Sequence, residues 1–272
     1  MTTLTIRRSV LPGFRLTLGV SLTFIVLLLL IPVAALVVKG SSQSVSAFWA
    51  SISSPRALAA FRVSLLASAA AATINTALGL ATAWVLERHR FAGRGLLDML
   101  IDVPFALPTS VAGITLATLY GPNGMIGRIL APLGIRVAYA PAGIVVALIF
   151  VTVPFAVRTL QPVIRDLDPE VEDAAESLGS SRLTTFLRVT LPELRPAILT
   201  AFTLSFARAI GEYGSVIFIA GNMPMRTETI PLLIMIHLDQ FDYATATAIA
   251  LAYLVAALLL LTIVQSMQWR RR

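Results

Sequence analysis

Long apolar stretches alternate with shorter polar ones along most of the chain. The apolar stretches have about 20 residues each, the length that an α-helix needs to cross the hydrocarbon core of a membrane. Backbone N–H and C=O groups find no water there, so a stretch of this kind predicts a helix. Six transmembrane helices are predicted, at 16–38, 63–86, 96–120, 138–157, 197–220 and 243–267. The intervening segments 39–62, 121–136 and 221–242 are predicted to be polar or irregular loops.

Residues 165–192 form the one markedly hydrophilic segment between two predicted spans. Asp168 and Pro169 are typical of a helix N-cap and first turn, and Gly179 is typical of a helix end. This pattern predicts a helix of about three turns. Its apolar positions recur at helical spacing and share one narrow face. These positions are Val171, Ala174, Ala175 and Leu178. Such a ridge can fit into a groove of another protein.

The third predicted span contains two features that an uninterrupted transmembrane helix would not have. Pro104 and Pro108 should bend it, because proline lacks a backbone N–H and clashes with the preceding turn. Asp98 and Asp102 lie one turn apart near its start. We expect these two carboxylates to have a structural role, such as capping a helix or pairing with arginine.

Composition places the chain among integral membrane proteins, with 57% hydrophobic residues, 13% charged residues and a mean hydropathy of +0.85. The net charge of +7 is better explained by basic loops than by nucleic-acid binding. The absence of cysteine excludes disulfides and thiolate metal sites. The two histidines, His89 and His237, are far apart in the sequence, which argues against a metal centre.

The distribution of basic residues predicts how the chain is oriented. Fourteen of the 21 basic residues fall on the side that holds both termini and segment 165–192, which should therefore be cytosolic. The chain then divides into a cytosolic arm (1–15), a six-helix domain (16–267) and a basic cytosolic tail (268–272). The alternative interpretation of the first span is a cleaved signal peptide. Its apolar run is longer than usual and Lys39 follows it directly, which favours a retained helix.

The sequence contains no recognisable energy source or catalytic motif. A phosphate-binding Walker loop needs a lysine within a G-x-x-x-x-G frame, and the only lysine, Lys39, lacks that frame. Neither H-E-x-x-H nor G-x-S-x-G occurs. The chain is therefore predicted not to be an enzyme and to hold no cofactor itself. ATP and magnesium would be bound by a partner subunit.

The hydrophilic segment resembles the E-A-A, x3, G, x9, I-x-L-P loop of permease subunits of bacterial ABC importers. Here Asp173 stands where that family has Glu, and Val189 stands where it has Ile. The resemblance implies an all-α fold of the type I ABC importer permease, with a cytosolic coupling helix that docks into a groove of the ATPase subunit. An amphipathic helix lying on lipid would instead be basic with large apolar anchors. The implied coupling residues are Glu172, Asp173, Ala174, Ala175, Leu178, Gly179, Leu191 and Pro192.

A second resemblance points to the substrate. Residues 204–222, with 102–109, 154–163 and 241–244, are similar to the sulfate/thiosulfate importer permeases, most closely their T-type subunit, and more loosely to molybdate and tungstate permeases. The resemblance implies four kinds of partner in the bacterial inner membrane and around it. They are a second homologous permease, two cytosolic ATPase subunits, a periplasmic sulfate/thiosulfate-binding protein and membrane lipid.

The fifth predicted span carries an ion pair candidate. Arg208 and Glu212 lie one helical turn apart. Placing a charged side chain inside a membrane costs free energy unless the charge is paired or faces water. The pair could brace the helix bundle, which we favour. Alternatively, Arg208 could border the translocation path and attract a dianion. Small or polar neighbours would then line the path together with the pair, namely Gly211, Gly214 and Ser215.

Two rival functions predict different measurements. A proton-coupled secondary anion transporter would use Glu212 as its proton carrier and Arg208 as the counter-charge, and its uptake would need no ATPase. A membrane-embedded enzyme would turn over its substrate as the purified chain alone.

Overall fold

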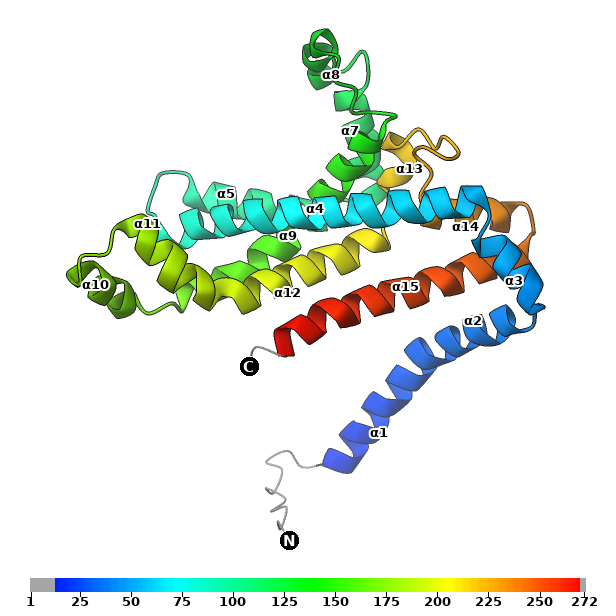
Figure 1. Cartoon of the computed structure of the whole chain (residues 1–272), viewed down its shortest axis with the longest axis horizontal. Helices are drawn as coiled ribbons and strands as arrows, with labels where there is room; N and C mark the ends of the chain where they lie inside the picture. Colours follow the sequence, from blue (N-terminus) through cyan, green and yellow to red (C-terminus); the bar gives the residue numbers. More distant parts are fainter. Residues whose placement is uncertain (1–12, 270–272) are drawn as a thin grey trace.

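The computed structural model describes residues 13–269, and every regular element among them is helical (Figure 1). The first half contains α1 (Phe14–Ile25), η1 (Val26–Leu30), α2 (Ile31–Ser41), α3 (Val45–Ile52), α4 (Pro55–Arg88), α5 (Arg94–Ile101), α6 (Val103–Ala106), α7 (Thr109–Tyr120), α8 (Met125–Leu130) and η2 (Ala131–Leu133). The second half contains α9 (Pro141–Arg165), α10 (Pro169–Ser177), α11 (Arg182–Thr185), η3 (Phe186–Thr190), α12 (Leu191–Ile210), α13 (Val216–Ile219), α14 (Ile230–Asp239) and α15 (Tyr243–Trp269).

Four helical stretches are long and apolar enough to cross a membrane, and they correspond to four of the predicted spans. They are Leu16–Ser41, Pro55–Arg88, Pro141–Arg165 and Tyr243–Val264. The first runs through α1, η1 and α2 without interruption, η1 being a single π-helical turn. The predicted arm (1–15) and tail (268–272) lie largely outside the described residues.

The other two predicted spans are broken, so the count of six continuous helices is not confirmed. The third divides into α5, α6 and α7. Its second break falls at Leu107, whose ψ of 131° is extended because Pro108 follows it. The fifth becomes α12, which begins earlier than predicted at Leu191, and the short α13. Residues 211–215 between them are not helical.

Three predictions of loops were wrong in part, because each loop contains a short apolar helix. Segment 39–62 holds α3, which is capped by Ser44 through a hydrogen bond from the Ala47 N–H. Segment 121–136 holds α8, and segment 221–242 holds α14, which is apolar over most of its length. Local polar and turn-forming residues around these helices concealed them in the sequence.

The bundle is built on α4, α9 and α12, and α15 packs against α12 and α14 (Figure 1). At one end of the bundle lie α10 and α11, where α4 ends; at the other lie α3 and the connection between α14 and α15. The α7 and α8 helices project sideways from the bundle. The apolar side chains of α1, η1 and α2 are largely exposed within the chain.

Small residues allow α4 and α9 to approach closely. A Cβ atom added to Gly79 would lie 2.8 Å from the Cβ of Ala156. One turn away, the Asn75 side-chain amide donates to the Ile149 carbonyl at 3.0 Å and to the Thr152 hydroxyl at 2.7 Å. Small residues at helix interfaces and interhelical hydrogen bonds are the usual means of association in a membrane.

We predict that Gly79→Leu destabilises the fold, because its side chain would overlap α9. Overpacking of this kind costs about 1–3 kcal/mol. The melting temperature of the detergent-solubilised protein should fall by several degrees. Gly95→Leu is the matched control, since a Cβ at Gly95 meets no atom within 4 Å. Equal melting temperatures for the two variants would contradict the prediction.

Candidate functional site

The α10 helix begins and ends as its sequence predicts. Asp168 is its N-cap, with Oδ1 accepting from the Glu170 N–H at 2.9 Å, and Pro169 is its first residue. Gly179 follows it at φ 85°, a conformation that favours glycine. The Gly179 N–H donates to the Glu176 carbonyl and the Ser180 N–H to the Ala175 carbonyl. These paired bonds form a Schellman motif, which ends the helix firmly.

The predicted apolar ridge of α10 lies largely on the surface of the chain. Leu178 is 89% exposed and Val171 is 45% exposed. Ala174 is also exposed, while Ala175 is half-buried. Burying a leucine is worth about 1.5–3 kcal/mol, so an exposed ridge of this kind is suited to a partner that covers it.

Glu172 points away from that surface. Its Oε1 accepts from Nη2 of Arg88 at 3.1 Å and from the Thr190 hydroxyl at 3.1 Å. The Arg88 guanidinium also lies 5.2 Å from the centre of the Trp84 ring, which packs edge-on against Phe186. Glu172 therefore joins α10 to the end of α4 and to η3. No local pattern predicts this contact, because Arg88 and Glu172 are 84 residues apart along the chain.

The remaining predicted coupling residues are divided between two places. Asp173 is exposed on α10, near the ridge. Leu191 and Pro192 are half-buried and form the first two positions of α12. The structure therefore brings Glu172 close to the start of α12 through Thr190, and leaves the exposed ridge separate from that contact.

A network of charges joins α4, α5 and α9 at the same end of the bundle. Arg158 contacts Asp98 at 2.6 Å and Asp102 at 2.6 Å, which confirms the expected pairing of these carboxylates with arginine. Glu87 contacts Arg165 at 3.1 Å and Arg94 at 3.7 Å. The Gln161 side chain links the two groups, since it donates to Glu87 and to Asp98 and accepts from Arg158.

The Arg208 and Glu212 side chains are paired, with Nη1 and Oε2 2.6 Å apart. The Glu212 side chain is only 3% exposed, and its Oε1 accepts from both the N–H and the hydroxyl of Ser215. These bonds hold the break between α12 and α13. A third of the Arg208 side chain remains exposed. The role of Arg208 in a translocation path stays a prediction.

The small residues near this pair differ in how tightly they are packed. A Cβ on Gly214 would overlap the Thr109 hydroxyl, and one on Gly113 would overlap the Ser215 backbone. Gly211 is exposed, and a Cβ there would meet nothing within 4 Å. Residue 214 must therefore be glycine for the segment 211–215 to pack against Thr109 of α7.

One ion pair and one helix cap at the opposite end of the bundle were not predicted. The Arg56 guanidinium donates two hydrogen bonds to Glu228, whose side chain is 1% exposed. Asp242 precedes α15 and accepts from the Thr245 N–H at 3.1 Å. The hydroxyl and the N–H of Thr245 both lower the pKa of Asp242.

Comparison with known proteins decides the family. Residues 75–269 match the model of the family described as "Binding-protein-dependent transport system inner membrane component". The chain belongs to this family. The predicted membership of the importer permeases is thereby confirmed, and the chain is an inner-membrane component of a transport system.

Curated relatives within the family cover almost the whole chain. The "Sulfate transport system permease protein CysT" of Salmonella typhimurium is 50% identical over 263 residues, which are 97% of this chain and 95% of that protein. The protein of the same name in Escherichia coli is also 50% identical, with the same coverage. The one in Synechocystis is 45% identical over 93% of this chain and 89% of its own length.

Solved structures confirm the predicted all-helical importer permease fold. A bacterial ABC transporter for the import of the acidic polysaccharide alginate superposes with a TM-score of 0.78 at 15% identity, covering 95% of this chain and 96% of that chain. The alginate transporter in complex with its alginate pentasaccharide-bound periplasmic protein gives 0.77 at 19% identity, covering 94% of each chain. At such low identity these superpositions concern the fold alone.

We predict that Glu172→Ala loosens α10, because the helix loses its contacts with Arg88 and Thr190. A partly exposed pair of this kind is worth about 1 kcal/mol, which corresponds to about fivefold faster exchange of the α10 amide hydrogens. Hydrogen–deuterium exchange mass spectrometry of the purified protein would measure it. Glu170→Ala is the control, since Glu170 occupies the same first turn without these contacts. Similar exchange in both variants would count against the prediction.

Proposed function

We propose that this chain is the membrane-spanning subunit of an ATP-driven importer of sulfate or thiosulfate. The observation that carries the proposal is the 50% identity to sulfate permeases over 97% of the chain. We propose sulfate rather than molybdate or tungstate as the substrate, because these relatives are named as sulfate permeases. The bundle of α4, α9 and α12, with the helices packed around it, would form half of the translocation pathway.

The exposed ridge of α10 supports a cytosolic ATPase partner. We propose that Val171, Ala174 and Leu178 enter a groove of that subunit, which binds and hydrolyses ATP with magnesium. The caps at both ends of α10 would keep the helix rigid when the ATPase subunit displaces it. The proposed orientation places α10 and both chain termini in the cytosol, in agreement with the distribution of basic residues.

The contacts of Glu172 suggest how movement would pass into the membrane. A displacement of α10 would act on Arg88 at the end of α4 and on Thr190 at the start of α12. The network of Glu87, Arg158 and Gln161 ties α4 to α9, so these helices would move together. A second homologous permease, facing this one, would complete the pathway, and a periplasmic binding protein would deliver the anion.

The environment of Glu212 favours bracing over proton transport. A proton carrier must reach water in at least one state, whereas Glu212 is buried and accepts bonds from Arg208 and Ser215. This arrangement supports an importer driven by ATP rather than by a proton gradient.

The proposed function is tested by sulfate uptake. The chain, its companion permease and the ATPase are expressed in a bacterium that lacks its own sulfate permeases. We expect ATP-dependent uptake of labelled sulfate that excess thiosulfate inhibits and molybdate does not. Uptake that disappears when an uncoupler collapses the proton gradient at constant ATP would support the secondary transporter instead. Uptake of molybdate in preference to sulfate would identify molybdate as the substrate.

We predict that Leu178→Glu abolishes coupling while leaving the permease folded. The side chain is exposed in the chain alone, so the change costs the fold little, but it places a charge in the proposed ATPase groove. Loss of about 1.5–3 kcal/mol of burial should weaken ATPase binding roughly tenfold or more. Copurification of the ATPase subunit and sulfate uptake would both be measured. Leu183→Glu, at an exposed leucine on α11, is the control. Retained copurification and uptake in Leu178→Glu would refute the docking role.

A further inference from the structure

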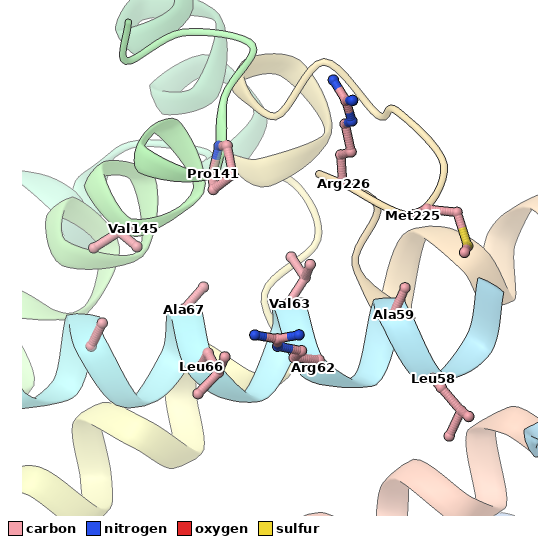
Figure 2. A pocket seen from close by; sticks show the side chains of 11 residues that line it. Leu58, Ala59, Arg62, Val63, Leu66, Ala67, Pro141, Val145, Met225 and Arg226 are labelled. Carbon is pink, nitrogen blue, oxygen red and sulfur yellow. The ribbon is translucent and has the colours of Figure 1, made fainter. Parts of the chain in front are cut away.

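A small cavity lies where the break between α12 and α13 meets α4, α9 and the start of α14. Figure 2 shows three of these segments, with Val63 on α4, Val145 on α9 and Arg226 on the loop that leads to α14. The wall of the cavity combines apolar and polar side chains, among them Ile144, Leu148, Val216, Ser68, Glu212 and Thr229. The cavity is therefore a polar spot inside an otherwise apolar part of the bundle.

Thr229 brings a buried hydroxyl to this cavity. It is the N-cap residue of α14, a position at which a threonine hydroxyl usually accepts from the N–H of the second or third helical residue. Here the second residue is Pro231, which has no N–H, and the Thr229 side chain makes no cap bond. Its Oγ1 has no hydrogen-bond partner within residues 13–269, although the residue is only 4% exposed. Buried hydroxyls are normally bonded, so this one points to a partner in the cavity.

Glu212 supplies an acceptor in the same wall. Its Oε1 accepts from the N–H and the hydroxyl of Ser215, at 2.9 and 3.0 Å. Its Oε2 lies 2.6 Å from Nη1 of Arg208. A carboxylate can accept about four hydrogen bonds. Oε2 can therefore accept from one further donor.

The size and the charge of the cavity select its ligand. Its volume is about 10 Å³, close to the roughly 10–15 Å³ that one water molecule needs. Among the described residues that line it, Glu212 alone is charged, and Arg208 already balances that charge. A sodium ion has a similar size, but it would add an uncompensated charge to a buried site. The cavity thus requires a small neutral ligand that both donates and accepts hydrogen bonds.

We propose that one water molecule is bound in this cavity and joins Thr229 to Glu212. The water accepts from the Thr229 hydroxyl and donates to Oε2 of Glu212, and the Ser68 hydroxyl is its third partner. Three hydrogen bonds are typical of a buried water. The water links the break between α12 and α13 to α4 and to the start of α14. This inference goes beyond the proposed function and does not depend on it.

The variant Thr229→Val tests the site, because valine keeps the shape of threonine and removes the hydroxyl. Loss of one hydrogen bond to the water should lower the melting temperature of the detergent-solubilised full chain by about 2–4 °C. Ser205→Ala is the control. The buried Ser205 hydroxyl also lacks a partner among the described residues, but Ser205 does not line the cavity. Its removal costs no hydrogen bond, so the melting temperature of this variant should not fall.

X-ray footprinting detects the water directly. Hydroxyl radicals that X-rays generate from a bound water oxidise the side chains beside it, even where bulk solvent cannot reach. We expect oxidation of Ile144 and Val216, which line the cavity, and not of Ile164 and Val157, which are equally buried elsewhere. The Thr229→Val variant should lose most of the oxidation of the two cavity residues.

Three results would overturn the site. A melting temperature of Thr229→Val equal to or above that of the wild type would show that the hydroxyl makes no bond to water. Oxidation of Ile144 and Val216 no greater than that of Ile164 and Val157 would show that the cavity is dry. A wild-type melting temperature that rises when sodium replaces potassium at constant ionic strength would assign the cavity to a cation.

Discussion

The close approach of α4 and α9 is the constraint on which the rest of the structure depends. Gly79 and Ala156 leave no room for larger side chains between the two helices, and Asn75 bonds α9 across the same interface. At this separation Glu87 on α4 can reach Arg165 on α9. The charges at this end of the bundle are thus paired with residues of neighbouring helices.

The α4 helix also connects the two ends of the bundle. One end contacts Glu172 of the proposed coupling helix, and the other carries Arg56, which anchors the loop of Arg226. A helix is stiff along its axis over this length. A displacement received at Arg88 would therefore reach the Arg56–Glu228 contact at the other end of the helix.

Long-range pairing explains what could and could not be predicted from the sequence. The apolar spans and the caps of α10 are local features, read from residues within a few positions of one another. Prolines signalled a bend near Leu107, whereas the break after Ile210 was not predicted, because it depends on the contacts of Glu212 with Arg208 and Ser215. The inward direction of Glu172 and the pair of Arg56 with Glu228 join residues 84 and 172 positions apart, so no local pattern reveals them.

The exposure of Leu178 has a consequence for how cells handle this protein. Under the proposed docking, a chain made without the ATPase subunit would leave this apolar side chain uncovered on a short, capped helix. Chaperones and proteases recognise uncovered apolar surface of this kind, so an orphan copy would be cleared while an assembled copy would be spared. The proposed docking would therefore make the survival of the chain depend on its assembly.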